Sequence, residues 1–394
     1  MVSDPLGAYP QSSAQRWRVG GEEIGFVSAI GVRGHPGIDP ALIALGDAID
    51  RGRLAPPGPH ALDASGGSGA VAALVQRQHA SAGRLLVQSA SVRRAALAGG
   101  LSDAELLSAH PWDLEASSLE EVWWRPASDR GWARVLTELD AWSRALLPAG
   151  RLVCVWHKDE GAKRAERAAA ACFAQVEVRN RSGGWRVVEL RQPTPSPTVR
   201  SPWLTWEGPS GPMRTLVGTF SADRLDAGTA ALLAALEQQG ARGEVAGGRV
   251  LDLGCGSGVL ALWAAQAGAA QVLALDDDLA AVRSCGASAS AAQVEARWSD
   301  LTHEVVLGAG FDVVLTNPPF HVGRQVVGAL SEAFVAAAAQ SLRPGGRLWL
   351  VANAALPFER LLAGWDALRE VTPSGERRYR VFSATCPANR SSNS

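Results

Sequence analysis

The chain has 394 residues, too long for one typical core, and this length predicts two domains of about 150 to 200 residues each. Hydrophobic residues make up 47% and charged residues 20%, a globular composition, and no apolar run reaches the roughly 18 residues that a bilayer-spanning helix needs. A formal net charge of −1 excludes long-range attraction of nucleic acid by the chain as a whole.

The first residues and the cysteines indicate a reducing compartment. Residues 1–15 contain prolines and an aspartate and lack the basic and apolar segments of a signal peptide. The five cysteines are scattered, with no CxxC pair and no histidine at metal-ligand spacing. We therefore expect a cytoplasmic protein with free thiols, no metal and no membrane partner.

The first half is predicted to alternate helices and strands. Apolar residues at helical spacing indicate helices, and short apolar runs bounded by turn residues indicate strands. The predicted elements are a helix at Ala41–Asp50, a strand end with a glycine-rich turn at Ala61–Gly69, a helix at Ala70–Gln78, a strand at Leu119–Trp124, a helix at Ala133–Leu147 and a strand at Arg151–Trp156.

The same order recurs in the second half, which favours an internal duplication of one α/β domain. A proline-spaced segment, Gln192–Thr198, is predicted to be a stiff linker, so we place the domains at 1–200 and 201–394. The predicted elements are a hairpin of Trp203–Trp206 and Met213–Val217, strands at Arg249–Leu253, Gln271–Leu275, Val294–Trp298, Phe311–Leu315 and Arg347–Val351, and helices at Val259–Ala267, Leu279–Ser284 and Val327–Leu342.

A glycine-rich turn follows the first strand of the second half. Gly254, Gly256 and Gly258 alternate with Cys255 and Ser257, and glycine lets a backbone approach a ligand closely. A plain turn and a dinucleotide-binding loop are the alternatives. The alternation lacks the wider GxGxxG spacing that seats a pyrophosphate, and Asp252 stands just before it. These details favour the cationic cofactor S-adenosylmethionine over a dinucleotide.

Two further strands of the second half end in carboxylates. Asp276 follows the strand after the glycine turn, where a carboxylate can accept hydrogen bonds from ribose hydroxyls. The alternative is that Asp276–Asp278 only cap the next helix, and Asp278 is the expected N-cap. Asp300 ends the following strand and is a candidate for the cofactor's adenine amine; its alternative is a surface turn.

The stretch Phe311–His321 contains the strongest candidates for catalytic groups. A buried strand is predicted to stop at Asn317, because Pro318 and Pro319 fix φ and remove two backbone donors. An amide, bare carbonyls and the ring of Phe320 then meet at the carboxyl end of a strand, where open α/β sheets bind ligands.

Four segments resemble the class I methyltransferases with tandem domains that modify the N2 amine of guanine in bacterial ribosomal RNA, of the small-subunit 16S rRNA methyltransferase C type. These segments are Gly218–Gly228, Asp252–Gly258, Asn317–Gly323 and Val351–Pro357.

The resemblance implies an α/β fold of two tandem Rossmann-like domains with mostly parallel seven-stranded sheets. It further implies a catalytic second domain that binds S-adenosylmethionine, and the expected cofactor-binding residues are Asp252, Gly254, Cys255, Gly256, Gly258, Asp276, Asp300 and Asn317. The first domain would be degenerate and would help to hold ribosomal RNA, within the ribosomal subunit, in a monomeric protein. The first half agrees, because Asp63–Gly67 lacks alternating glycines and Arg125-Pro126 replaces Asn-Pro-Pro-Phe.

An exocyclic amine is a poor nucleophile, since its lone pair is delocalised into the ring. The Asn317 side-chain oxygen and the Pro318 carbonyl are expected to accept its two N–H groups and stabilise the developing positive charge, while Phe320 stacks on the base. No strong base is required, because the alkylated amine loses its proton readily. His321 is the alternative base, and its other interpretation is local packing.

The expected RNA contacts are less specific. Basic residues gather at Arg377–Arg380 and at Lys158–Arg167, where the alternative is solvated charge. Trp123 and Trp124 end a strand and are candidates for base stacking if they are exposed. Rival functions are a 23S rRNA guanine-N2 methyltransferase, an adenine-N6 or protein-glutamine methyltransferase, and a non-catalytic RNA-binding assembly factor.

Overall fold

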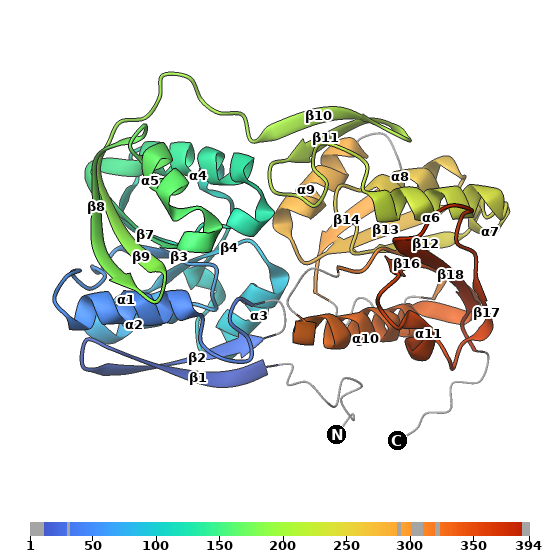
Figure 1. The fold of residues 1–394 in the computed structure, drawn as a ribbon, viewed down its shortest axis with the longest axis horizontal. Coiled ribbons are helices and arrows are strands. Elements are labelled where there is room, and N and C mark those ends of the chain that lie inside the picture. The colour runs from blue at the N-terminus through green and yellow to red at the C-terminus, as the bar shows by residue number, and fades with distance from the viewer. Residues whose placement is uncertain (1–11, 30–31, 290–292, 301–309, 320–323, 388–394) are drawn as a thin grey trace. The chain divides into compact units, whose positions relative to one another are not determined.

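The computed structural model describes residues 12–29, 32–289, 293–300, 310–319 and 324–387. Its contacts divide the chain into two compact units between Pro202 and Trp203. Each unit is an α/β domain built on one seven-stranded sheet (Figure 1). Within the described ranges, no helix has the length and apolarity needed to cross a membrane.

The sheet of the first unit has the strand order β5-β4-β3-β6-β7-β9-β8, in which only the pairings of β9 are antiparallel. A separate antiparallel ribbon, β1-β2, precedes it. The elements are β1 (Ser12–Val19), β2 (Glu22–Ala29), α1 (Pro40–Asp50), β3 (Ala61–Ala64), α2 (Ala70–His79), β4 (Arg84–Val87), α3 (Ala90–Ala98), β5 (Leu106–Ser108), β6 (Leu119–Trp124), α4 (Trp132–Ala145), β7 (Leu146–His157), α5 (Ala162–Ala169), β8 (Phe173–Ser182) and β9 (Trp185–Pro193).

The second unit repeats this topology with the order β14-β13-β12-β15-β16-β18-β17 after the hairpin β10-β11. Only the pairings of β18 are antiparallel in its sheet. The elements are β10 (Trp203–Gly208), β11 (Gly211–Leu216), α6 (Ala227–Gln238), α7 (Arg242–Val245), β12 (Arg249–Leu253), α8 (Val259–Gln266), β13 (Gln271–Asp276), α9 (Leu279–Ser288), β14 (Val294–Trp298), β15 (Phe311–Thr316), α10 (Arg324–Ser341), β16 (Leu342–Asn353), α11 (Phe358–Leu361), β17 (Asp366–Glu370) and β18 (Tyr379–Thr385).

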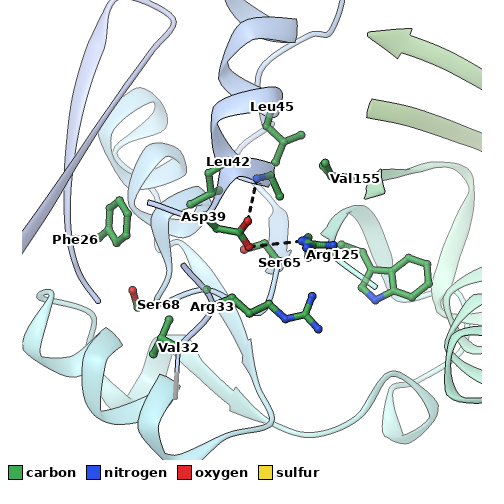
Figure 2. A pocket seen from close by; sticks show the side chains of 13 residues that line it. Phe26, Val32, Arg33, Asp39, Leu42, Leu45, Ser65, Ser68, Arg125 and Val155 are labelled. Atoms are coloured by element: carbon green, nitrogen blue, oxygen red, sulfur yellow. Dashed lines mark hydrogen bonds and ion pairs between the residues drawn. The ribbon is translucent and has the colours of Figure 1, made fainter. Parts of the chain in front are cut away.

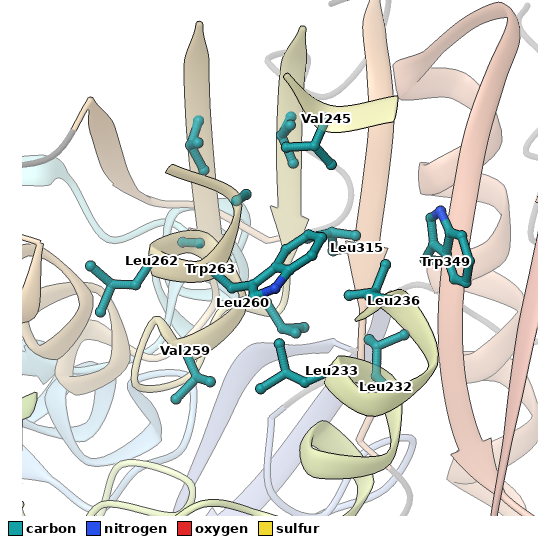
Figure 3. Close-up of a cluster of buried hydrophobic side chains, with 14 of the residues drawn as sticks. Leu232, Leu233, Leu236, Val245, Val259, Leu260, Leu262, Trp263, Leu315 and Trp349 are labelled. Atoms are coloured by element: carbon teal, nitrogen blue, oxygen red, sulfur yellow. The ribbon is translucent and has the colours of Figure 1, made fainter. Parts of the chain in front are cut away.

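Strand periodicity places alternate residues of the central strands in two different cores. In β12, Val250 packs in the cluster under α6, α7, α8 and α9, whereas Leu251 packs in the cluster under α10 and α11. Figure 3 shows part of the first cluster, in which Trp263 of α8 lies beside Leu260 and Leu233. Because both faces are covered, the strands are apolar along most of their length. Asp252 is the exception in β12.

The prediction of a linker at Gln192–Thr198 is wrong only for its first two residues: Pro193 pairs with Phe173 and ends β9, since a proline is tolerated at the last pair of a strand. Thr194–Thr198 lie outside any helix or strand, between β9 and β10. The expectation for two tryptophans is wrong. Trp123 and Trp124 are not exposed for stacking: they are 1% and 4% exposed. Their strand β6 lies in the middle of a sheet covered on both faces, so both rings are core.

Candidate functional site

Two adjacent parallel strands bring the predicted site residues to one edge of the second sheet. Leu253 at the end of β12 pairs with Thr316 at the end of β15. The Thr316 hydroxyl donates to the Leu253 carbonyl at 2.7 Å. The chain therefore leaves both strands at the same level, and the glycine turn after β12 lies beside Asn317. Pro318, which follows, is buried.

The glycine turn is held by the neighbouring strand and leaves one face open. The backbone N–H groups of Gly254 and Cys255 both donate to the Leu275 carbonyl at 2.9 Å. Gly256 has φ +52°, and among the described residues a Cβ there would approach the Phe220 carbonyl alone, at 4.0 Å. Gly258 has φ +90°, and its Cβ would lie 2.8 Å from the Cys285 Sγ. Gly258 is thus required for close packing, whereas Gly256 presents bare backbone.

Asp252 anchors the start of α8 and keeps one free oxygen. Its side chain is fully buried, and Oδ2 accepts a hydrogen bond from the Ala261 N–H at 2.9 Å. Oδ1 is buried without a hydrogen-bond donor among the described residues. Burial raises the pKa of Asp252 to about 7, and the Asp276 charge adds to the shift. A cationic ligand beside Asp252 would offset the free-energy cost of burying its ionised carboxylate.

Asp276 lies behind the glycine turn, and Asp300 ends the strand beside it. The Asp276 oxygens accept from the N–H groups of Gly256 and Asp278, each at 2.8 Å. Burial raises the pKa of Asp276 to about 7, assisted by the Asp278 charge. Asp278 is the N-cap of α9, as the sequence predicts. Asp300 is 9% exposed, and the preceding Ser299 N–H donates to the Asp276 carbonyl.

Asn317 is fixed by two residues that sequence reasoning did not assign to the site. Its Nδ2 donates to Asp226 Oδ2 at 2.9 Å and to Thr229 Oγ1 at 3.0 Å. Its Oδ1 is buried and contacts no donor in the part of the chain that the structure describes. A signal was present in the sequence: aspartate three residues before threonine at a helix start is the pattern of an N-cap.

A cavity joins these parts. Asp276 and Asp300 are not among the described residues that line it. One wall is the segment before α6 and its first turn, which the sequence linked to the family but not to the pocket. The lining residues are Phe220, Ser221, Arg224, Leu225, Asp226, Thr229, Gly254, Cys255, Gly256, Ser257, Val259, Leu260 and Asn317.

Two predicted residues, Phe320 and His321, lie outside the described residues, so their expected roles stay predictions. All five cysteines are free thiols. Across the described ranges, no group of three or more His, Cys, Asp or Glu is placed to hold a metal ion.

The equivalent cavity of the first unit, about 420 Å³, is crossed by an ion pair (Figure 2). Arg125 follows β6 as Asn317 follows β15. Its guanidinium forms two hydrogen bonds with Glu160, at 2.6 and 3.0 Å, and lies 3.5 Å from the Asp39 carboxylate. It also stacks 4.6 Å from the Trp185 ring centroid. The arginine is therefore a fixed structural group.

The first unit also satisfies its buried carboxylate internally. Asp63 occupies the place in β3 that Asp252 occupies in β12, and its Oδ2 accepts from two N–H groups of α2. Its Oδ1 accepts from both the N–H and the hydroxyl of Ser65, which stands where the other turn has Gly254. The matching oxygen of Asp252 has no donor among the described residues. Within the described ranges, buried acceptors without a donor at these two equivalent positions occur in the second unit and not in the first.

Replacing Arg125 by methionine is expected to destabilise the first unit by about 2 to 3 kcal/mol, because Asp39 and Glu160 would lose their closest cation and keep only the weaker interaction with Arg33. Hydrogen exchange read by mass spectrometry should show faster exchange in β6 and β7 and unchanged exchange in β12. The double variant Arg125→Met with Glu160→Gln should recover part of the protection. Unchanged exchange in the single variant would contradict a structural role for Arg125.

The basic clusters expected to contact RNA are partly neutralised. Arg380 is paired with Glu359 and Glu370. Arg378 lies over the Tyr379 ring at 5.7 Å, and Arg164 lies over the Trp132 ring at 4.3 Å. These contacts agree with the alternative of locally satisfied surface charge for Arg380.

Comparisons with known proteins match the second half most strongly. Residues 211–383 match the family described as "Methyltransferase small domain". Two relatives carry the name "Ribosomal RNA small subunit methyltransferase C". The one from Chromohalobacter salexigens is 40% identical over 185 residues, 46% of this chain and 54% of its own. The one from Erwinia tasmaniensis is 32% identical over 243 residues, 61% of this chain and 69% of its own.

The chain thus spans about half the length of the first curated relatives that it matches. A solved structure, "T. Thermophilus 16S rRNA N2 G1207 methyltransferase (RsmC) in complex with AdoMet and Guanosine", matches more of the chain and is 31% identical. It covers 94% of this chain and 97% of its own with a TM-score of 0.80, so both seven-stranded domains have a counterpart there.

Proposed function

The chain belongs to the ribosomal RNA small subunit methyltransferase C family, and we propose that it methylates the N2 amine of a guanine in 16S ribosomal RNA, with S-adenosylmethionine as methyl donor. The observation that carries the proposal is Asn317, a strand-end amide that lines the cavity together with the glycine turn and whose buried oxygen meets no donor among the described residues. A relative of the same fold was solved in complex with AdoMet and guanosine.

The residues present fit S-adenosylmethionine, which supplies an electrophilic methyl group on a positively charged sulfur. The open backbone at Gly256, the unpaired Asp252 Oδ1 and the strand-end Asp276 are groups that a cationic ligand with amine and hydroxyl donors would satisfy. Asp300 is proposed to serve the adenine amine.

Asn317 acts on the acceptor. Its Oδ1 accepts an N–H of the guanine amine, and the Pro318 carbonyl accepts the other, which turns the lone pair toward the donor. Both oxygens then stabilise the positive charge that develops on nitrogen. The base must leave any helix to enter such a cavity, and Phe320 is proposed to stack on it. Water takes the proton from the alkylated amine.

The first unit is proposed to be non-catalytic and to contribute to RNA binding. Its cavity is crossed by the Arg125 ion pairs, and its buried Asp63 is satisfied without a ligand. The substrate is proposed to be the rRNA within the small ribosomal subunit, and the protein a cytoplasmic monomer. Residues 1–200 would then bind RNA, and residues 201–394 would carry out catalysis.

The deciding experiment is to delete the gene and map lost methyl groups in ribosomal RNA by primer extension and nucleoside mass spectrometry. One missing N2-methylguanosine in 16S rRNA, restored by the wild-type gene, is the expected result. Loss in 23S rRNA, or loss of a methyladenosine or methylglutamine, would replace the proposed substrate. Unchanged methylation together with absent cofactor binding would favour an assembly factor.

Cofactor affinity is expected to rise with pH across neutrality. The pKa values of Asp252 and Asp276 are raised to about 7, so both carboxyls are partly protonated at neutral pH without ligand. A cationic ligand favours the ionised forms, and binding should release protons. The dissociation constant should therefore be higher at pH 6 than at pH 8, by about tenfold if one carboxyl must ionise and by up to about 100-fold if both must. Calorimetry in two buffers of different ionisation enthalpy measures both effects.

The stability of the ligand-free protein is expected to fall with rising pH, whereas the cofactor affinity rises. Because the folded pKa of each group lies above its unfolded value, its contribution to stability is present below about pH 4 and is lost as pH rises through about 7. Cofactor should accordingly raise the melting temperature more at pH 8 than at pH 6. A dissociation constant that is flat from pH 6 to 8, without proton release, would contradict this part of the proposal.

A further inference from the structure

Asn317 can act on an amine only if its oxygen, and not its NH2 group, faces the cavity. The two orientations of an amide differ little in shape, so hydrogen-bond partners decide between them. An ionised carboxylate is acceptor-only, and Asp226 Oδ2 lies 2.9 Å from the Asn317 Nδ2. The reverse orientation would set two acceptors against each other and turn a donor toward the substrate.

We infer that Asp226 is a positioning residue that sets the orientation of the Asn317 amide, and that it thereby makes the site select an N–H donor as its nucleophile. This inference rests on the proposed function. Thr229 supports it as a second acceptor, 3.0 Å from the same nitrogen. Both residues line the cavity with Asn317. The unpaired Oδ1 is the result of this arrangement.

Asp226 is itself held in place. It is the N-cap of α6, and the same Oδ2 accepts the Thr229 N–H at 2.9 Å. A Cβ on Gly228 would lie 3.0 Å from this oxygen and 3.0 Å from the Tyr379 ring, so glycine leaves room for both. Burial raises the pKa of Tyr379, and the nearby Asp226 carboxylate raises it further. The cap therefore has a fixed position relative to Asn317.

The first unit provides an internal comparison. Asp39 caps α1 through the Ala41 N–H, and its other oxygen meets Arg125, the residue that follows β6. In both units, the N-cap aspartate thus contacts the residue that directly follows the fourth strand of the sheet, which is β6 in the first unit and β15 in the second. In the first unit the partner is the guanidinium of Arg125, which also pairs with Glu160. In the second unit it is the amide of Asn317, whose Oδ1 has no donor among the described residues.

Three substitutions separate capping from orientation. Asp226→Ser keeps an N-cap hydroxyl, because serine caps as well as aspartate, but its shorter side chain does not reach Asn317. Asp226→Asn offers an amide oxygen in the place of Oδ2, which can accept from both Thr229 and Asn317. Thr229→Val removes only the second acceptor and preserves the shape of the side chain.

The Asp226→Ser variant should fold normally, with a melting temperature within about 3 °C of wild type and an S-adenosylmethionine affinity within about threefold. Its kcat for small-subunit RNA should fall about 10- to 100-fold, as expected for loss of a residue that orients a functional group. Asp226→Asn should restore kcat to within about fivefold of wild type, and Thr229→Val should fall between the two.

A second measurement reports the choice of nucleophile. Guanosine and inosine, which differ in the 2-amine, are used as competing inhibitors of methylation. Wild type should prefer guanosine by about tenfold, because inosine leaves the Asn317 oxygen unpaired, and Asp226→Ser should lose this preference. Asp226→Ser turnover within threefold of wild type, while Asn317→Ala is inactive, would overturn the inference. So would an Asp226→Asn variant as impaired as Asp226→Ser.

The orientation can also be read without activity. In wild type, the Asn317 side-chain amide protons should be protected from solvent exchange in nitrogen-15 NMR spectra, and Asp226→Ser should abolish this protection. Fast exchange in wild type would contradict the inference. Protected protons in a wild-type protein that transfers no methyl group to RNA would support the orientation and overturn only the proposed function.

Discussion

Replacing Asn317 by alanine is expected to lower kcat for RNA methylation at least about 1000-fold, equivalent to about 4 kcal/mol of transition-state stabilisation. Asn317 lines the cavity, its buried oxygen has no donor among the described residues, and alanine removes this acceptor. The glycine turn does not depend on this side chain, since its own N–H groups are held by the Leu275 carbonyl. S-adenosylmethionine affinity, measured by calorimetry, should therefore stay within about threefold.

The matched variant is Asn317→Gln, which keeps the amide but moves it by one methylene group. Because the acceptor must lie in line with the reacting amine, glutamine should be nearly as inactive as alanine. Methylation by Asn317→Ala at a rate near that of wild type would remove this residue from the chemistry. A large loss of cofactor affinity would instead assign it to cofactor binding.

Replacing Asp276 by alanine is expected to weaken S-adenosylmethionine binding about 100-fold. Two effects add: the carboxylate proposed to meet the ribose hydroxyls is lost, and the Gly256 N–H loses its acceptor, which loosens the turn. Calorimetry gives the dissociation constant. At saturating cofactor, kcat should recover to within about fivefold of wild type, because Asp276 is not among the described residues that line the cavity with Asn317.

The neighbouring carboxylate supplies the control for Asp276. Asp277→Asn changes charge by the same amount one residue later, and affinity should stay within about threefold of wild type. Equal losses for Asp276→Ala and Asp277→Asn would indicate a general charge effect. An unchanged dissociation constant for Asp276→Ala would refute its proposed role.

Local sequence signals predicted the elements that present the site. The strand Arg249–Leu253 and the strand Val294–Trp298 have the predicted limits, and Asp278 caps α9 as expected. These features depend on short-range rules, since strand ends follow from glycine and proline and N-caps from aspartate before an apolar run. The side-by-side position of the glycine turn and Asn317 followed from the rule that parallel strands end at one edge.

Long-range contacts were not predictable in the same way. The sequence does not show that Asp226 and Thr229 lie against Asn317, some 90 residues later, because that pairing depends on where α6 packs on the sheet. The exposure expected for Trp123 and Trp124 was wrong because burial depends on the covering helices, not on the strand itself.

The functional difference between the two halves lies in side-chain contacts that the sequence does not show. From the sequence, Arg125 was a departure from the expected motif. In the structure it is a closed ion pair with Glu160 and Asp39, and Ser65 satisfies Asp63. The second half keeps the same scaffold, and among the described residues the acceptors of Asp252 and Asn317 have no donor. The two halves therefore differ in whether the buried polar groups at these positions are satisfied within the chain.

The central claim is that Asn317 directs methyl transfer to the N2 amine of guanine in 16S rRNA. It is tested most directly by incubating the full-length protein with S-adenosylmethionine and small ribosomal subunits that lack the modification, followed by mass spectrometry of the RNA nucleosides. Wild type should form N2-methylguanosine, and Asn317→Ala should form none above background. N6-methyladenosine, methylated protein, or equal N2-methylguanosine from both proteins would contradict the claim.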